Sequence, residues 1–496
     1  PFVAMCDHGH IQDFPWREWV HRTIHPTCTK PMRLHAKGGA SLSAQIVICE
    51  CGERRSLAGI TGADPEKNVT YLTEHLDRDG TPFLCPGRMP WLGSEKAHGC
   101  SRPIRGSLRN AANVYFPQVR SAIYLPREAA GAPQELVEAL QKPPLSTLVH
   151  LIRSSGEEPR AENIREMYPR LVASYTDEEL NQALRVTGEE PTAGVEVSSE
   201  PKGETEFRRA EYEVLRVSRE SDALRTRVMD IGEYEPWMGR YFEQIVLVEK
   251  LRETRAFIGF SRVFPTAPFR LKELRQMLWR RPPKKMWLPA YQVFGEGILL
   301  IFKEERLRSW EQDPTVLNRV NVLNQAYQTV RSRRRLEERQ LSPRFVLLHT
   351  VAHLLMNRLT FECGYSSAAL RERLYISTGT SPMAGVLIYT AAGDSEGTMG
   401  GLVRMGHPGL LEPVLQAALE AARWCSADPV CMEVGSTAGQ GPDSCNLAAC
   451  HNCALVPETA CEEFNRFLDR GVVVGDVDGV VTPYFDRFHW QGAAQG

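Results

Sequence analysis

Thirteen cysteines are the residues of this chain best suited to chemistry, and they gather towards its two ends. Six lie within residues 6–100 and six within residues 425–461, while Cys363 stands alone between the groups. Each group contains a short spacing, Cys-x-Cys at 49–51 and Cys-x-x-Cys at 450–453. Such spacings bring neighbouring thiolates onto one tetrahedral metal ion. The pattern therefore predicts structural zinc near both ends of the chain.

The C-terminal cysteines predict one closed zinc site. Two pairs of cysteines separated by a loop are typical of a four-thiolate site. We expect its ligands to be Cys425, Cys431, Cys450 and Cys453. Cys445 and Cys461 are alternative ligands for this zinc site, so the sequence predicts the site more firmly than it predicts which four cysteines form it. A group of small buried thiols is the alternative, because free cysteines pack well in protein cores.

The N-terminal cysteines predict two further zinc sites. A four-thiolate ribbon would use Cys49, Cys51, Cys85 and Cys100. A second site would combine two thiolates and two imidazoles, from Cys6, His10, His21 and Cys28. His8 and His25 are rivals for the imidazole positions, and a lone histidine is more often a surface or capping residue. None of these sets shows the carboxylate and open position of a catalytic zinc site, so we expect zinc to stabilise the fold.

Two histidines, His349 and His353, stand four residues apart in an apolar segment that predicts a helix over 346–358. The spacing suits two metal ligands, but Thr350 replaces the glutamate that follows the first histidine in zinc protease helices. The favoured interpretation is a pair of core histidines. The alternative is a metal-dependent nuclease or hydrolase that uses His349, His353, Glu372 and Asp394 around a divalent ion.

Basic residues concentrate between positions 262 and 285, where eight of them stand against one acid, Glu273. A helix is predicted over 271–281, and arginines beside Trp279 and Trp287 could meet phosphates and exposed bases. The candidate nucleic-acid contacts are Arg270, Lys272, Arg275, Arg280, Arg281, Lys284 and Lys285. An ordinary solvated face with core tryptophans explains the same run equally well.

The elements that must position these residues alternate between β and α patterns. Short β-type runs occur at 44–49 and 113–125, and apolar residues recur with helical spacing over 127–185. Further helices are expected around 236–253 and 409–424, and strands at 298–302 and 385–389. The stretch 187–206 has the composition of a linker.

These patterns predict a multidomain protein of α/β and α+β class. We expect a zinc-ribbon-like module over 1–126, a helical segment and linker over 127–206, a mixed α/β region with the basic helix over 207–345, and a mixed α/β C-terminal domain with the four-cysteine zinc site over 346–496.

Composition narrows the class of protein. At 496 residues, 42% hydrophobic and 24% charged, the chain is globular and long enough for several domains. No segment approaches the ~20 apolar residues that cross a bilayer, and no export leader is expected. The cysteine spacings favour a reducing cytoplasm over a disulfide scaffold. The phosphate-binding sequence Gly-x-x-x-x-Gly-Lys-Ser/Thr does not occur, so we do not expect ATP hydrolysis by that mechanism.

Several strings of the sequence resemble one family. The strings are CDHGHIQDFPWREWVH (6–21), GRMPWL (87–92), NAANVYFPQVRSAIYLP (110–126), LRETRAFIGFSR (251–262) and NLAACHNCALVPETACEEFNRFLDR (446–470). They are similar to the DrmB family of the bacterial DISARM anti-phage defence system. The last string, with the histidine helix, also resembles a zinc-containing domain that follows some helicase cores. The family usually begins further upstream, so we expect residues before Pro1.

The resemblance implies a non-catalytic subunit that forms a heterodimer with the DISARM helicase DrmA and helps bind DNA, with the ATPase in the partner. The family's cysteine pattern matches Cys425, Cys431, Cys450 and Cys453, and its opening Cys-x-x-Gly-His matches Cys6, Gly9 and His10. The resemblance supplies no catalytic residue. It implies DrmA and DNA as partners. Zinc as the cofactor, no membrane association and a cytoplasmic location are expected from the cysteine spacings and the hydropathy above.

Overall fold

A computed structural model describes residues 1–36, 38, 41–64, 68–93, 99–126, 134–188, 200–265, 274, 277–279, 287–334, 336, 338–366, 368–390, 400–433 and 439–486. The chain forms two compact units, each assembled from distant segments. The first contains 1–121, 255–291 and 325–340, and the second contains 122–254, 292–324 and 341–496. The four-part division expected from the sequence remains a prediction.

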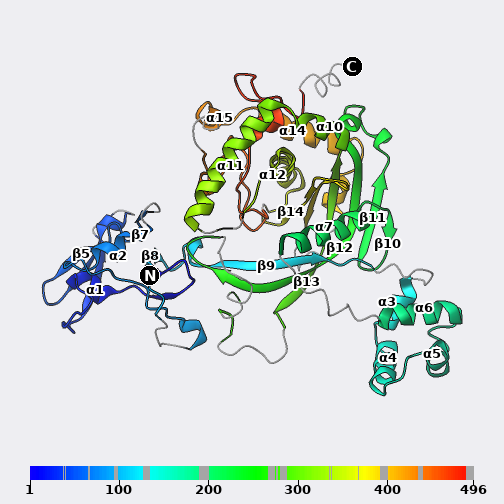
Figure 1. Cartoon of the computed structure of the whole chain (residues 1–496), viewed down its shortest axis with the longest axis horizontal. Helices are drawn as coiled ribbons and strands as arrows, with labels where there is room; N and C mark the ends of the chain where they lie inside the picture. Colours follow the sequence, from blue (N-terminus) through cyan, green and yellow to red (C-terminus); the bar gives the residue numbers. More distant parts are fainter. Residues whose placement is uncertain are drawn as a thin grey trace. The chain divides into compact units, whose positions relative to one another are not determined.

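The first unit consists of small antiparallel sheets and short helices (Figure 1). Its sheets have the strand orders β2-β1-β8, β3-β4-β5 and β6-β7. The elements are β1 (Phe2–Met5), β2 (Ile11–Asp13), α1 (Trp16–His21), β3 (Met32–Ala36), β4 (Gln45–Cys49), β5 (Arg54–Ser56), β6 (Ala63–Asp64), β7 (Val69–Thr70), α2 (Tyr71–His75) and β8 (Arg105–Leu108). The cysteines Cys6, Cys49 and Cys85 are part of its core. Its sheets have two or three strands each, so metal ions bound by these cysteines would add to its stability.

The helical periodicity over 127–185 is confirmed as four short helices of the second unit. They are α3 (Gln134–Leu140), α4 (Leu145–Ser154), α5 (Ala161–Met167) and α6 (Asp177–Gly188). Their apolar faces form a core of their own, which includes Leu136, Leu140, Leu148, Ile164 and Leu180. Residues of the expected linker from position 200 onward belong to helix α7 (Glu200–Leu215).

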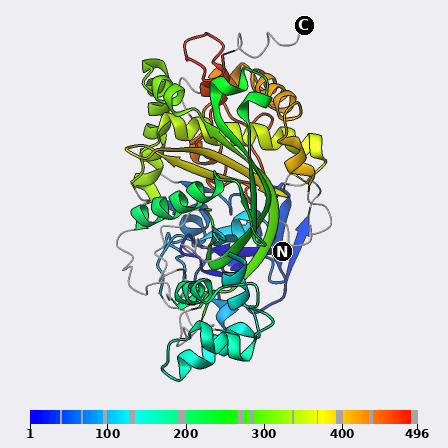
Figure 2. The ribbon, with the colours of Figure 1, turned by 90° about the vertical axis from the view of Figure 1, so that its right-hand side faces the viewer.

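A seven-stranded sheet organises the rest of the fold, with strand order β10-β11-β12-β13-β15-β14 and with β9 paired to β12. Figure 2 shows its long strands side by side. The strands are β9 (Phe116–Ile123), β10 (Arg219–Glu220), β11 (Leu224–Met229), β12 (Phe242–Ser261), β13 (Ala290–Phe302), β14 (Leu370–Ser377) and β15 (Met383–Thr390). The register opposes Leu299 to Leu387 and Leu374 to Val386, which places apolar side chains together on the sheet. The strands expected at 298–302 and 385–389 are thus confirmed.

The helix expected around 236–253 is wrong. Only the short helix α8 (Met238–Tyr241) forms there, and β12 begins at Phe242. Helix-favouring Glu, Leu and Lys residues suggested the helix, but burial alternates along the segment, with Leu251, Glu253 and Arg255 buried and their neighbours less so. Pairing with β11 and β13 in the sheet therefore overrides the local helix preference.

Helix α12 (Pro343–Cys363) is the central helix of the C-terminal part (Figure 1). Ser342 caps its start by accepting a hydrogen bond from the Phe345 amide, and Gly364 ends it in the left-handed conformation. It packs against β14 and against α14, so the predicted helix over 346–358 lies inside a buried element. The other helices are α10 (Glu304–Glu311), α11 (Pro314–Arg334), α13 (Gly401–Met405), α14 (Leu411–Ala422), α15 (Val430–Glu433) and α16 (Arg470–Val474). No described helix combines the length and apolarity needed to span a bilayer.

Candidate metal centres

The four C-terminal cysteines come together as the sequence predicts. Their sulfur atoms all lie within 4.8 Å of one another. The Sγ–Sγ distances are 3.5 Å between Cys425 and Cys450, 3.9 Å between Cys431 and Cys453, and 3.8 Å between Cys450 and Cys453. Sulfurs bound to one tetrahedral zinc at about 2.3 Å stand about 3.8 Å apart. The arrangement therefore fits a four-thiolate zinc site, which we call the Cys425 quartet.

Hydrogen-bond donors in the Cys425 quartet favour a thiolate at Cys431, whereas the contact with Cys431 raises the pKa of Cys453 and burial raises that of Cys450. The Ala427 amide donates to Cys425 Sγ at 3.5 Å, and Gln440 Nε2 donates to Cys431 Sγ at 3.3 Å. The hydrogen bond with Cys453 lowers the pKa of Cys431 to about 5, against the effect of burial and with help from Gln440 and Arg470. The Arg470 guanidinium is fully buried and also donates to Ala422 O. A fixed positive charge thus stands beside the sulfurs.

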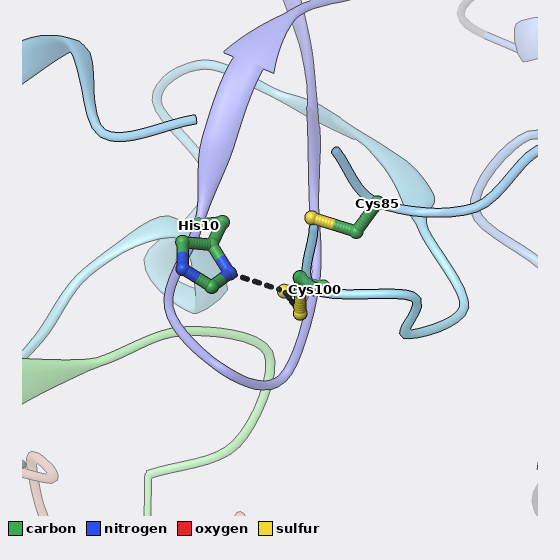
Figure 3. Close-up of side chains that lie close together, drawn as sticks. His10, Cys85 and Cys100 are labelled. Atoms are coloured by element: carbon green, nitrogen blue, oxygen red, sulfur yellow. Dashed lines mark hydrogen bonds between the residues drawn. The ribbon is translucent and has the colours of Figure 1, made fainter. Parts of the chain in front are cut away.

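In the first unit, one quartet is formed by Cys6, His10, Cys85 and Cys100, whose ligand atoms lie within 4.8 Å of one another. Figure 3 shows His10, Cys85 and Cys100 pointing towards a common centre. Cys6 Sγ is 3.5 Å from His10 Nδ1 and 3.9 Å from Cys100 Sγ. The Gly87 amide donates to Cys85 Sγ at 3.4 Å, as the Ala427 amide does to Cys425. We call this site the Cys6 quartet. It connects the turn between β1 and β2, which holds Cys6 and His10, to Cys85 and Cys100.

The other quartet of the first unit is formed by His21, Cys28, Cys49 and Cys51, the Cys49 quartet. Cys28 and Cys49 approach to 3.7 Å between sulfurs. His21 Nε2 is buried and has no hydrogen-bond partner in the described part of the chain. A buried imidazole nitrogen without a partner is costly, and a metal ion among the three sulfurs would satisfy it. The donor set thus fits zinc.

The grouping expected for the N-terminal ligands is wrong, although every expected residue falls in one of the two quartets. Cys49 and Cys51 do not join Cys85 and Cys100. The β3-β4-β5 sheet ends near α1 and Cys28, while the 85–100 segment returns to the β1–β2 turn. Each quartet thus combines one pair of ligands from each expected set, and the spacing of the cysteines does not show which distant pairs share an ion.

The rival ligands take different places. His8 Nδ1 lies 3.8 Å from Cys100 Sγ, at the edge of the Cys6 quartet, and this contact raises the pKa of His8. His25 and Cys445 belong to no quartet of the described residues. Cys461 does not replace a member of the Cys425 quartet, because it belongs to a cluster with His349, His353 and Glu372. That these twelve residues hold zinc in these sets remains a prediction.

The candidate nucleic-acid contacts Arg270, Lys272, Arg275, Arg280, Arg281, Lys284 and Lys285 lie outside the described residues. The two tryptophans beside them are described. Trp279 and Trp287 pack edge to face, with ring centroids 5.5 Å apart. Trp287 is 55% exposed, so the expectation of core tryptophans fails for this residue.

Three of the four residues considered for a hydrolytic metal site do converge. His349, His353 and Glu372 meet, Cys461 is the fourth member of their cluster, and Asp394 lies outside the described residues. The cluster is buried throughout, as expected for core histidines. Burial opposes ionisation of Glu372, but the two imidazoles lower its pKa below the usual range, and burial lowers the pKa of His353. A substrate would have to reach a fully enclosed carboxylate, which argues against hydrolysis here.

Comparisons with known proteins decide the family. The chain is 30% identical to the DISARM protein DrmB of Bacillus paralicheniformis over 505 residues, which cover 98% of this chain and 82% of that protein. The chain belongs to the DrmB family. A family model described as the MrfA Zn-binding domain matches residues 351–454 of this DrmB-family protein, which contain the whole Cys425 quartet. The zinc cofactor predicted from cysteine spacing is thereby confirmed.

A second family model, described as a domain of unknown function (DUF8724), matches residues 1–116. This range holds both N-terminal quartets of the DrmB-family chain. The sequence had indicated a separate module there from its cysteines alone, and the match adds no function to it.

Proposed function

We propose that this DrmB-family protein is a non-catalytic, zinc-stabilised subunit of an anti-phage DISARM complex. It partners the helicase subunit DrmA, which supplies ATP hydrolysis, and contributes to DNA binding. Homology over nearly the whole chain supports the role in defence. The observation that carries the non-catalytic role is the closed geometry of its metal sites.

Closed geometry means that each of the three cysteine quartets offers four protein ligands to one ion. Zinc with four protein ligands has no position left for a water molecule or a substrate, whereas catalytic zinc keeps one open. Such sites contribute folding free energy instead. The ions would hold the loop-rich first unit and the C-terminal domain in shape, and the surfaces they support would meet the partner and the DNA.

Co-purification tests the partnership. The full chain is expressed with DrmA and captured through a tag on DrmA, and we expect the two proteins to elute together. ATPase activity should follow DrmA and be absent from the chain alone. Hydrolysis of ATP by the chain alone, or failure to associate under conditions where both proteins are folded, would contradict the proposal.

The salt dependence of DNA binding tests the basic run. Each phosphate neutralised on duplex DNA contributes about 0.9 to the slope of log K against log salt. Charge reversal of Arg275, Arg280 and Arg281 to Glu should lower the slope of the complex by about 2 to 3. A matched control reverses three exposed arginines of the four-helix segment, Arg160, Arg170 and Arg185. Equal slopes for the two triple variants would remove the basic run from the DNA path.

A further inference from the structure

We propose that the C-terminal domain binds a second zinc ion, held by His349, His353, Glu372 and Cys461 and enclosed in the core. These four residues come from α12, β14 and the loop before α16. One ligand atom from each lies within 4.8 Å of the others, and all four residues are buried. The inference concerns the fold of this domain and does not depend on the proposed partner or DNA.

The distances among the four ligand atoms match a tetrahedral ion. His349 Nε2 lies 3.1 Å from Glu372 Oε1 and 3.2 Å from Cys461 Sγ, and His353 Nε2 lies 3.5 Å from Glu372 Oε2. Nitrogen and oxygen ligands at about 2.0–2.1 Å from a tetrahedral zinc stand about 3.3 Å apart. A set of one thiolate, two imidazoles and one carboxylate is a ligand combination that zinc accepts.

The hydrogen-bond pattern leaves lone pairs facing the centre. His353 Nδ1 lies 2.9 Å from Ala454 O, and a carbonyl can only accept, so this nitrogen carries the proton. In the neutral ring Nε2 then has a lone pair, and it faces a carboxylate oxygen that also has only lone pairs to offer. Both His353 Nε2 and Glu372 Oε2 are buried without a hydrogen-bond partner in the described structure. A cation between them resolves the repulsion.

Two backbone amides donate to the sulfur of Cys461, while burial and the Glu372 charge raise the pKa of its thiol. Its sulfur accepts hydrogen bonds from the Glu463 amide at 3.3 Å and the Asn465 amide at 3.2 Å. The first of these repeats the contact two residues onward that Cys425 and Cys85 receive in the cysteine quartets. Two amide donors already stabilise negative charge on the sulfur, so its remaining lone pairs are free for an ion.

A hydrogen bond to the backbone links this site to the Cys425 quartet. Ala454, which accepts from His353, directly follows Cys453 of that quartet. Glu372 Oε1 accepts from the Glu462 amide at 3.0 Å, which orients the carboxylate. The loop from Cys453 to Cys461 therefore runs from one metal centre to the other, and α12 is fixed to both. Four protein ligands in a closed core indicate a structural ion rather than a catalytic one.

A core without the ion would need a different explanation for the same atoms. An imidazolium at His353 could pair with Glu372, but this places a charged pair in a fully buried position with one carboxylate oxygen and one ring nitrogen poorly matched at 3.5 Å. Buried ion pairs are stable only when the geometry is good and the other lone pairs are satisfied. A zinc ion satisfies both His353 Nε2 and Glu372 Oε2, whereas His349 Nδ1, on the far side of its ring, has no hydrogen-bond partner among the described residues.

Metal content of the purified full chain tests the site. We expect four zinc ions per chain by plasma mass spectrometry, three from the cysteine quartets and one from this site. The double variant Glu372→Gln, Cys461→Ser should hold three, and Cys363→Ser, a cysteine outside every quartet of the described residues, should hold four. Three ions in the wild-type chain, or an unchanged count in the double variant, would overturn the proposal.

Anomalous diffraction at the zinc edge covers the case in which the double variant does not fold. Crystals of the unaltered chain should show a peak within bonding distance of His349 Nε2 and Cys461 Sγ, at about 2.0–2.3 Å. Peaks at the cysteine quartets with none at this position would overturn the site. Signal at another metal's edge at this position would overturn the assignment of zinc.

Discussion

Ten of the thirteen cysteines belong to the three cysteine quartets, so the chemistry of this protein at the scale of the residue is that of thiolate ligands. Cysteine spacing indicated zinc. The four ligands of the Cys425 quartet could be predicted from the sequence because its two pairs lie within thirty residues. The N-terminal sets could not, because ligands are exchanged between segments far apart. Three members of the cluster around His349 were considered together from the sequence, but Cys461 was expected to compete for the C-terminal zinc site instead. Glu372 and Cys461 stand far along the chain, and only the register of β14 beside α12 brings them together.

A single ligand of the Cys425 quartet offers the first residue-scale prediction. Cys425→Ser should release one zinc ion per chain and lower the thermal midpoint, because the remaining three thiolates lose a ligand and ion affinity with it. Cys363→Ser should change neither quantity. Zinc content by plasma mass spectrometry and melting by circular dichroism measure both. Full zinc content in Cys425→Ser would exclude this sulfur as a ligand.

A buried ion pair gives the second prediction. Asp469 is fully buried and accepts from Arg319 at 2.7 and 3.0 Å and from the Gly471 amide at 2.9 Å. Asp469→Ala leaves the Arg319 charge buried without its partner, and it should lower the free energy of unfolding by about 3–5 kcal/mol. Arg308→Ala, which breaks the half-exposed pair with Glu304, should cost at most about 1 kcal/mol. Urea unfolding followed by tryptophan fluorescence compares the two, and equal losses would contradict the assignment.

Elements were predictable where one signal dominates. The apolar run predicted a helix over 346–358, and α12 extends it at both ends to Pro343–Cys363, between the caps Ser342 and Gly364. Strand β12 was not predicted, since a sequence of Glu, Leu, Lys and Arg reads as helix until neighbouring strands pair with it. The side chains of Glu253 and Glu296 are buried in the sheet, and this burial could not be predicted from the local sequence because it depends on tertiary contacts. Strand pairing between distant segments is the information that local propensity lacks.

The start of α11 gives an element-scale prediction with a pH dependence. Asp313 precedes the helix and accepts from the Thr315 amide at 2.8 Å and from Thr482 Oγ1 at 2.8 Å. The hydrogen bonds from Thr315 and Thr482 lower the pKa of Asp313. A carboxylate with a lowered pKa stabilises the fold above its unfolded pKa, and this stability is lost as pH falls through the folded value.

Asp313→Ala should therefore lower the free energy of unfolding by about 1 kcal/mol at neutral pH. The difference in stability between the variant and the wild type should shrink below about pH 4. Asp313→Asn is the control, because asparagine caps a helix nearly as well without a charge. Thermal melts across pH 3–7 measure the effect. A difference that grows on acidification would contradict the cap.

At the scale of the whole molecule, both units contain candidate zinc sites, but we expect the stability of the first unit to depend on zinc more than that of the second. The first unit has small sheets and a core that includes its own cysteines, while the second has a long sheet and several buried helices. The composition indicated several domains, but the discontinuous make-up of each unit could not be read from the sequence. It follows that removal of metal should not affect the two units equally.

Chelation followed by hydrogen exchange tests this division. Treatment with a strong zinc chelator should remove amide protection from strands β1, β4 and β8 first, because metal binding supplies much of their folding free energy. Strands β13 and β15 should keep most of their protection, since they lie in the interior of the large sheet. Restored zinc should restore the pattern. Simultaneous loss in both units would show that the ions support the whole chain as one cooperative body.

Native mass spectrometry of the intact, folded chain tests the central claim most directly. The account predicts a mass that exceeds that of the reduced polypeptide by bound zinc ions, with every cysteine thiol present after the ions are removed. A folded chain without metal, or one whose mass is lower by two hydrogens for each pair of cysteines, would show disulfides in place of zinc. That result would contradict the account.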